Sequence, residues 1–536
     1  MNKSERWIIV AVCIILSIFL SIFYYGVSAA RHLDTVFLFE STLSILQTGR
    51  PISHTVSTWP DAAKTFSTTP DELGRADLVG GGQDYNVFRN HAYSALYPIS
   101  LLVLLIGPEL TFAIINALAH VLLIIIPFIY LRKRGLGLVP GAAFVLCILL
   151  YPAWSLSALG EYYLDRLYMP FALLSLYFLR GFSAGESGPA SWRSMIAFAT
   201  FAVGAAMFTE RAAIMIIMAV GFYLIFFPSL WKKPRIKYVL LSIVAFLCLY
   251  LIMYFACFYA GIEEGGSLLG NLLPSPNLIL SRFAVPGFVP FVLVNLMFLG
   301  FLIPFSGFRC FLLVVMAMTP NILINVGGAE FNNWLTHYHT MYIPFIIFAA
   351  SIGFHGLVGR FDKKIWGRYG IPVMICVCVF ISARMLNPYT GKLGGDASGT
   401  IRQGIMGRIY AYYFKPSRSP EKISSDALKA LNQYIPPNVN VSALEGAMPA
   451  LYKSRSLSYY PINMDKADYL VIGGTEKNGK VITVSGAICF LGAEQSETLN
   501  RLLYERLTKN GFLLHRAIRN VGVLIFKRTD KVNNAK

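Results

Sequence analysis

Apolar runs long enough to cross a bilayer recur along most of this chain. A spanning helix needs roughly 20 predominantly apolar residues. We expect spans near residues 7–30, 110–131, 138–158, 167–182, 194–210, 211–230, 237–260, 287–306, 309–326, 342–358 and 369–387. With 56% hydrophobic and 14% charged residues, the chain fits no class of soluble protein. It is predicted to be an α-helical polytopic membrane protein with about eleven transmembrane helices, the first of which is an anchor and not a cleaved signal.

The positions of Lys and Arg predict the orientation of these spans, because basic residues near span ends stay in the cytoplasm. Most of them fall on one side, around residues 3–6, 132–134, 232–237 and 360–368. The short loops on the other side carry little more than Arg166, Arg211 and Arg282. We therefore expect a cytoplasmic N-terminus and an extracytoplasmic C-terminal region.

The net charge of +18 does not indicate nucleic-acid binding. Much of it lies in the cytoplasmic loops, where it sets topology and meets anionic lipid head groups. Seven of the eight cysteines lie in apolar spans and only Cys489 lies in the C-terminal region. The sequence therefore contains no disulfide framework and no zinc motif.

Two long outer segments organise the rest of the chain. Residues 1–387 are predicted to form the transmembrane domain, with an outer interfacial loop over residues 31–107. In this loop Leu33–Gln47 is expected to be a helix along the membrane interface, because its apolar residues recur at helical spacing. A mobile polar loop is expected over residues 51–83. The apolar piece that follows and ends at Gly107 is too short to span, and is expected to be a second interfacial or re-entrant helix.

The second outer segment, residues 388–536, is predicted to form an α/β domain. We expect helices over residues 420–434, 447–453 and 497–509, strands over 439–444, 469–472 and 481–484, and a hairpin over 512–527 that turns at Asn520. Gly473-Gly474 after a strand is too little to indicate a nucleotide site. In the absence of a specific motif, we expect this domain to have a packing role or to guide an acceptor.

Several short motifs follow one another in a fixed order along the chain. They are Leu33-Asp34-Thr35-Val36-Phe37, His91 to Pro98, Asp165 before Pro170, Thr209-Glu210-Arg211, His337-Tyr338-His339, and in the C-terminal domain Tyr434 to Val439, Met448 to Arg455 and Ala467 to Val471. Their order resembles a bacterial family of polytopic inner-membrane proteins known only as a domain of unknown function. That family is grouped with the GT-C glycosyltransferases, such as the protein mannosyltransferase and aminoarabinose transferase types. The chain departs from the family at two places: Thr209 stands where a lysine is usual, and Thr35 where a glycine is common.

The resemblance implies a GT-C-like fold, a polyprenyl-phosphate-linked sugar donor that arrives from the membrane, and a lipid, glycan or protein acceptor at the outer face. Inverting transfer needs a carboxylate that takes the proton of the incoming hydroxyl. Asp34 is the candidate for this base, or for the ligand of a divalent cation. The alternative is that Asp34 only caps the helix that follows it, because Asp is a favoured N-cap residue. The sequence itself requires no cofactor, and metal dependence stays open.

The remaining candidates are ionisable residues at the same outer boundary. Asp165 is a candidate second carboxylate, with Arg166 as a phosphate binder, although the two could simply neutralise each other. Glu210 and Arg211 lie between two apolar runs, where ionisable residues indicate function unless they only pair with each other. Glu210 is therefore a third candidate catalytic carboxylate, beside Asp34 and Asp165. Candidate substrate-binding residues are His91, Arg166, Arg211, Arg282, His337 and His339. Two of them have a simpler explanation. His91 could be an ordinary surface residue, and the long side chain of Arg282 could simply extend from the membrane to the aqueous interface. The His337 and His339 pair has no third ligand at a spacing typical of a metal site.

Two other functions compete with glycosyl transfer. A transporter or flippase of a lipid-linked substrate commonly shows internal repeats and helices broken near the midplane. We find no convincing repeat, and the acidic candidates gather at one face of the membrane. A non-catalytic scaffold for cell-envelope assembly would tolerate the loss of the Asp34 carboxylate. Neither the sugar nor the acceptor can be read from the sequence.

Overall fold

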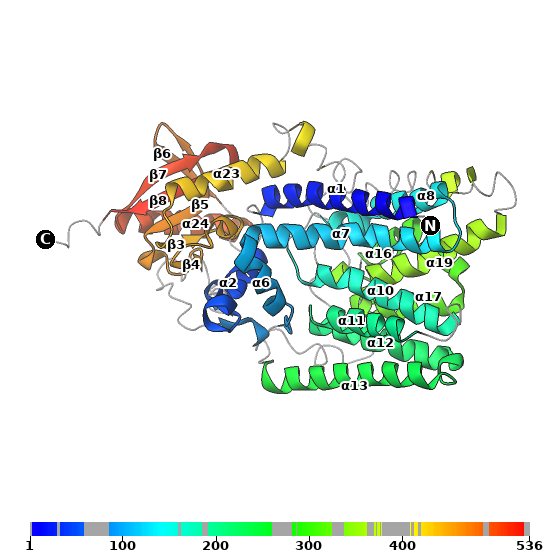
Figure 1. The fold of residues 1–536 in the computed structure, drawn as a ribbon. Coiled ribbons are helices and arrows are strands. Elements are labelled where there is room, and N and C mark those ends of the chain that lie inside the picture. Colours follow the sequence, from blue (N-terminus) through cyan, green and yellow to red (C-terminus); the bar gives the residue numbers. More distant parts are fainter. Residues whose placement is uncertain are drawn as a thin grey trace. The chain divides into compact units, whose positions relative to one another are not determined.

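The computed structural model describes residues 3–28, 33–57, 85–89, 91–158, 162–184, 191–259, 281–285, 287–323, 337–361, 369–370, 372–375, 377, 408, 412–415, 420–485 and 493–529 (Figure 1). The chain divides into two compact units, and each is built from three separate stretches. The first unit contains Met1–Ser21, Phe88–Ala95 and Ile114–Tyr410, and the second contains Ile22–Val87, Leu96–Ala113 and Ala411–Lys536. The expected polar loop over residues 51–83 and the expected domain boundary near residue 387 lie largely outside the described residues.

The first unit is helical. Its helices are α1 (Lys3–Ser28) and α7 (Pro108–Lys133), which both extend into the second unit, and α8 (Leu138–Leu150), α9 (Pro152–Ser157), α10 (Asp165–Ala184), α11 (Trp192–Ala206), α12 (Glu210–Phe226), α13 (Pro234–Cys257), α16 (Phe288–Phe298), α17 (Phe308–Leu323) and α19 (Ile343–Phe361). Helices α10, α11, α12 and α13 pack side by side, and α19 packs against α10 and α17 (Figure 1). Short 3-10 helices follow several of them: η2 (Pro228–Leu230), η3 (Gly300–Ser306) and η4 (His337–His339).

Four helices in the described part of the chain are long and apolar enough to cross a membrane. They are Lys3–Gly26, Pro108–Lys133, Pro234–Cys257 and Ile343–Arg360. These agree with four of the expected spans. Two other expected spans are wrong as single helices. The span over 138–158 breaks after α8, because Tyr151 precedes Pro152 and takes an extended conformation, which prolines favour in the residue before them. The span over 287–306 changes from α16 to the 3-10 helix η3. The expected span over 369–387 lies mostly outside the described residues.

The close approach of α19 to η3 depends on a glycine. A Cβ atom added at Gly353 would lie 1.9 Å from the carbonyl oxygen of Leu302, so any larger residue would push the two elements apart. This contact belongs to the packed interior of the first unit, where Phe345, Phe348 and Leu302 are fully buried. Because protein interiors are close-packed, even a small change of side-chain volume there displaces the neighbouring elements.

The second unit starts with helix α2 (Leu33–Thr48), followed by the two-residue strand β1 (Ile52–Ser53), α3 (His54–Ser57), β2 (Tyr85–Asn86) and η1 (Val87–Arg89). Strands β1 and β2 pair antiparallel. Helix α6 (Leu96–Ile106) is the short apolar piece expected from the sequence, and it packs against α2. It ends at Gly107, whose φ of +78° lies in the left-handed region that glycine adopts without strain. Pro108 then starts α7, where its missing N–H costs nothing.

The C-terminal part of the second unit is the predicted α/β domain. Its elements are α23 (Pro420–Tyr434), β3 (Asn440–Ala443), η7 (Glu445–Leu451), β4 (Ser456–Tyr459), η8 (Met464–Lys466), β5 (Tyr469–Lys477), β6 (Lys480–Ser485), α24 (Ala493–Lys509), β7 (Phe512–Ile518), η9 (Arg519–Val521) and β8 (Val523–Arg528). The strand order is β4-β3-β5-β8-β7, with β6 paired to β5. Strands β4, β3 and β5 run parallel, whereas β6, β8 and β7 join antiparallel. The expected helices and strands are present, with the helix expected over residues 447–453 observed as the 3-10 helix η7, and the sequence prediction missed strand β4 and the 3-10 helix η8.

Helix α2 is part of the core of this same unit. Val36 is buried together with Leu431 of α23 and with Leu470 and Ile472 of β5. Val36, Phe37, Leu38 and Phe39 are all buried, so α2 has no exposed side over these four positions. The amphipathic pattern expected of an interfacial helix is therefore wrong for this part of α2. Its apolar residues are covered by protein instead.

Candidate active site

Residues 88–95 form a short segment of the first unit that is fastened to the junction of α11 and α12. The Ala95 N–H donates to the carbonyl oxygen of Met207 at 2.9 Å, and the Ser94 hydroxyl donates to the same oxygen at 3.3 Å. From α13, the Tyr250 hydroxyl donates to the carbonyl oxygen of Ala92 at 3.0 Å. These bonds, together with the contacts of Glu210 described next, place His91 beside the first turn of α12.

Glu210 is the first residue of α12, and its carboxylate is surrounded by donors. Oε2 accepts from the Ala92 N–H at 3.0 Å and from the Thr209 hydroxyl at 3.2 Å. Oε1 lies 3.1 Å from Nδ1 of His91 and 3.8 Å from Nε of Arg211. The positive end of the helix dipole also favours a negative charge at this position. A carboxylate has about four lone-pair sites, so most of the acceptor capacity of Glu210 is used within the protein.

The contact with Glu210 determines which nitrogen of His91 carries a proton. An ionised carboxylate can only accept, so Nδ1 of His91 must donate. In the neutral ring this leaves Nε2 with a lone pair, and in the protonated ring Nε2 becomes a second donor. No hydrogen bond joins Nε2 to another residue that the structure describes, and the side chain is 25% exposed. The contact with Glu210 therefore fixes the orientation of the His91 imidazole, and the role of this ring in binding a substrate stays a prediction.

Arg211 adds a positive charge to the same cluster. Its guanidinium lies over the ring of Tyr338 at 5.8 Å from the centroid, and a third of its side chain is exposed. The negative charges of Asp165 and Glu210 both act on it electrostatically. The structure thus brings three sequence-predicted candidates of the first unit into contact, which are His91, Glu210 and Arg211, and Asp165 acts on Arg211 electrostatically. Tyr338, from the motif His337-Tyr338-His339, joins them.

Asp165 and Arg166 are both buried, at 1% exposure each. They are the first two residues of α10, where an aspartate is favoured by the helix dipole. The Arg166 guanidinium lies over the ring of Tyr163 at 5.4 Å. The expected outer turn therefore carries its two charged residues inside the unit and not on its surface.

Asp34 is the second residue of α2 and belongs to the second unit. Only its backbone position is described, at the N-terminal end of this helix. As the second helical residue, Asp34 lies within the first turn and not at the N-cap position, and the helix dipole favours its negative charge there. Its role as the base stays a prediction. The convergence of Asp34 with Asp165 and Glu210 stays a prediction.

Two other candidates lie in the packed interior of the first unit. His339 is fully buried, with Nδ1 2.9 Å from the Tyr342 hydroxyl. In the same unit, the Tyr151 hydroxyl donates to Oδ1 of Asn295 in α16. Arg282 is 7% exposed and its Nε donates to the carbonyl oxygen of Ile322 at 3.3 Å, so it does not snorkel freely. Their binding roles stay predictions, and the side chain of His337 lies outside the described part.

The sequence analysis did not single out three groups of interest, and of these only His120 carries a signal, as an ionisable residue in an apolar span. Tyr250 is one tyrosine among the apolar residues of α13, and the Ala92 N–H is a backbone group. His120 of α7 is fully buried, with Nδ1 2.8 Å from the carbonyl oxygen of Asn116 and its ring 6.1 Å from that of Trp154. An ionisable residue within a spanning helix is a candidate functional residue in its own right.

The described residues also indicate whether this cluster could hold a divalent cation. Among them, no group of three or more His, Cys, Asp or Glu side chains is arranged to hold a metal ion. In the cluster of the first unit, the Glu210 carboxylate is engaged by His91, Ala92 and Thr209, so its donor set does not fit a cation. We therefore derive no chemistry through a metal at this site.

Comparison with known proteins finds likeness at the level of structure. No family model matches the chain, and no curated protein matches it in sequence. Two crystal structures of ArnT from Cupriavidus metallidurans resemble it over 99% of this chain and 99% of ArnT. The structure bound to undecaprenyl phosphate has a TM-score of 0.51 at 13% identity, and the apo structure has 0.53 at 12% identity. The chain therefore has the GT-C membrane fold of ArnT, with its several apolar helices and a C-terminal sheet region.

Proposed function

We propose that this protein is a membrane glycosyltransferase that transfers a sugar from a polyprenyl-phosphate donor to an acceptor at the extracytoplasmic face of a bacterial inner membrane. The observation that carries the proposal is the likeness to ArnT over almost the whole of both chains, because ArnT was crystallised with undecaprenyl phosphate. The cluster around Glu210 supports it, because it combines an arginine and an imidazole, the two side chains suited to a phosphate.

The contacts within this cluster give each residue a role. Arg211 is partly exposed and binds phosphate oxygens of the donor, for which a planar guanidinium is well shaped. His91 presents Nε2 to the same group. Glu210 holds both of them and has little capacity left for a substrate proton, so we assign it a positioning role and not that of the base.

Asp34 remains our candidate for the base. Its carboxylate takes the proton of the acceptor hydroxyl while the bond between the anomeric carbon and the donor phosphate breaks. The hydroxyl oxygen then forms the new glycosidic bond, and polyprenyl phosphate leaves with the electrons of the broken bond. An ordinary aspartate is ionised at neutral pH and is ready for this step.

The test uses the purified full-length protein in lipid nanodiscs with a panel of polyprenyl-phosphate sugars. We expect consumption of at least one donor, and a fall of about a hundredfold or more in the Asp34→Asn variant, in keeping with removal of a general base. Asp426→Asn, at an exposed position of α23, is the matched control and should keep wild-type turnover.

Binding of undecaprenyl phosphate tests the cluster separately from the chemistry. Arg211→Ala should weaken this binding, whereas Arg193→Ala, at an exposed position of α11, should not. Full turnover by Asp34→Asn would remove the base assignment alone. If no donor is bound or consumed, the glycosyltransferase proposal is wrong, and flipping of a lipid-linked substrate becomes the next activity to measure.

A further inference from the structure

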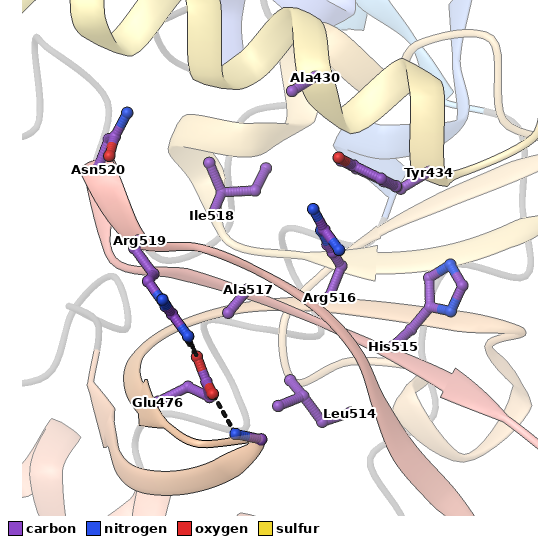
Figure 2. Close-up of a pocket in the computed structure, with 11 residues that line it drawn as sticks. Ala430, Tyr434, Glu476, Leu514, His515, Arg516, Ala517, Ile518, Arg519 and Asn520 are labelled. Carbon is purple, nitrogen blue, oxygen red and sulfur yellow. Dashed lines mark hydrogen bonds and ion pairs between the residues drawn. The ribbon is translucent and has the colours of Figure 1, made fainter.

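The C-terminal domain contains a cavity that the proposed transfer chemistry does not use. Its volume is about 540 Å³, and it lies between the end of α23 and the strand β7 at the edge of the sheet (Figure 2). Its wall is formed by Ala430 and Tyr434 of α23, by Glu476 and Gly479 around the turn from β5 to β6, and by residues 514–520 of β7 and η9. All of these belong to the second unit. A cavity of this size is in the range that holds small ligands in proteins.

A bulge in β7 determines which side chains reach the cavity. Leu514 pairs with Phe526 and Arg516 with Ile525, so His515 is an extra residue without a partner in β8. Bulges at sheet edges change the direction of side chains and are common beside binding sites. Figure 2 shows the Arg516 side chain rising from β7 toward Tyr434, with His515 next to it.

Arg516 provides positive charge at this end of the cavity. Its guanidinium lies over the ring of Tyr434 at 5.2 Å from the centroid, which orients the planar group. Among the residues that the structure describes, no carboxylate pairs with Arg516. Its charge is therefore available to an anion, and the adjacent His515 and the Tyr434 hydroxyl can add hydrogen bonds.

The opposite end of the cavity carries a fixed carboxylate. Glu476 accepts a hydrogen bond from the Gly479 N–H, and Arg519 binds its Oε2 through Nε at 3.1 Å and through a terminal guanidinium nitrogen at 3.0 Å (Figure 2). These three bonds leave about one of the four lone-pair sites of the Glu476 carboxylate to accept a hydroxyl group, and its negative charge disfavours a second anion at this end. Between the two ends, Leu514, Ala517 and Ile518 provide apolar surface.

We propose that this cavity binds an anionic saccharide, with its phosphate or carboxylate group on Arg516 and His515 and its hydroxyl groups on Glu476. The apolar residues between the two ends contact the C–H faces of the sugar ring. The two polar ends of the cavity together favour a ligand that has both an anionic group and hydroxyl groups. A neutral sugar leaves Arg516 unused, and a bare inorganic anion leaves Glu476 unused. The inference does not depend on the proposed function, because it concerns binding and not transfer.

The test measures binding to the full-length protein in nanodiscs by saturation-transfer NMR and titration calorimetry. The probes are glucose 6-phosphate and glucuronate, with glucose and inorganic phosphate as comparisons. We expect both anionic sugars to bind about tenfold or more tightly than either comparison, because each comparison loses one of the two polar ends. The two anionic probes also distinguish a phosphate from a carboxylate as the preferred group.

Three variants locate the binding. Arg516→Ala should weaken binding of the anionic sugars about tenfold or more, since a charge-assisted bond is lost. Arg501→Ala, at an exposed position of α24, is the matched control and should leave it unchanged. Arg211→Ala should also leave it unchanged, which separates this cavity from the phosphate site of the first unit. Equal binding by Arg516→Ala and the wild type, equal binding of inorganic phosphate and sugar phosphate, or the absence of binding would each overturn the proposal.

Discussion

Nδ1 of His91 and the carboxylate of Glu210 are 3.1 Å apart, although 119 residues separate them in the sequence. The same carboxylate accepts from the backbone N–H of Ala92, so Glu210 fixes both the side chain and the main chain of this segment. Such a carboxylate fixes the tautomer and the orientation of an imidazole. In the function that we propose, the donor phosphate contacts Nε2 of His91 and the guanidinium of Arg211.

Two substitutions of His91 distinguish a substrate contact from a purely structural one. The amide nitrogen of His91→Asn occupies about the position of Nδ1 and can keep the bond to Glu210, but nothing replaces Nε2. The amide of His91→Gln reaches the position of Nε2 instead. If Nε2 contacts the donor phosphate, Asn should raise the KM for the donor about tenfold, whereas Gln should retain more of the wild-type affinity.

The measurement is steady-state donor consumption, with thermal unfolding as the control for folding. The opposite order, with His91→Asn near wild type and His91→Gln impaired, would mean that His91 serves only to bond Glu210.

Tyr250→Phe removes the hydroxyl that holds the segment 88–95. This hydroxyl donates to the carbonyl oxygen of Ala92, so its loss should lower the free energy needed to open the segment by about 1 kcal/mol. Hydrogen exchange over residues 91–95 should then speed up roughly fivefold, a factor that corresponds to this free energy. Tyr238→Phe is the control, because Tyr238 is exposed on the same helix. Unchanged exchange in Tyr250→Phe would show that the bonds to Met207 hold the segment without Tyr250.

Glu40 of α2 should be important for the stability of the second unit. Its Oε2 accepts from the Ser53 hydroxyl at 2.7 Å and from the Thr55 N–H at 3.0 Å, and its Oε1 accepts from the Thr55 hydroxyl. Glu40→Gln replaces one accepting oxygen with an NH2 group that can only donate, and should lower the free energy of unfolding by about 2 kcal/mol. The readout is the thermal unfolding midpoint, against Glu505→Gln at an exposed position of α24. Equal midpoints for both variants would contradict a stabilising role for Glu40.

The Glu476 carboxylate should make the C-terminal domain sensitive to acid. The hydrogen bond from the Gly479 N–H and then that from Arg519 lower the pKa of Glu476 below its ordinary value. A carboxyl group with a lowered pKa in the folded state contributes stability above its unfolded pKa and loses it as the pH falls through the folded pKa. The wild type should therefore be more stable than Glu476→Gln at neutral pH, and this difference should vanish in acid.

Unfolding midpoints of both proteins between about pH 7 and about pH 3 test this. Arg519→Ala should raise the pKa of Glu476, so that the difference disappears at a higher pH than in the wild type. A difference that stays constant over the whole pH range would rule out the charge of Glu476 as its cause.

Much of the fold follows from local patterns in the sequence. Length and apolar character were enough to predict helices such as α7 and α13, and the helix α23 has the predicted bounds of residues 420–434. Strand β4 was missed because only four residues form it and half of them are serine. The break before Pro152 could have been anticipated from the proline. The buried position of α2 could not, since part of its cover comes from η7, which lies about 400 residues further along the chain.

The candidate site was predictable in its members but not in its contacts. Ionisable residues such as His91, Glu210 and Arg211 stand out in apolar surroundings, so composition alone identifies them. Which of them meet is a matter of tertiary packing, and a single sequence holds no record of it. The positioning role of Glu210 emerges only from the donors around it, two of which are the Ala92 N–H and the Thr209 hydroxyl.

The second unit is built from three separate stretches of the chain, and this limits how the protein can be divided into fragments. Val36 shares the core of the C-terminal sheet, and the Phe39 ring meets that of Tyr452 edge to face. A fragment that starts at Ala411 would lack both partners and leave apolar surface uncovered. The C-terminal domain is therefore not an exchangeable module. Chimeras with a relative must swap Ile22–Val87 and Leu96–Ala113 along with it, and coevolution should couple these distant stretches more strongly than neighbours in sequence.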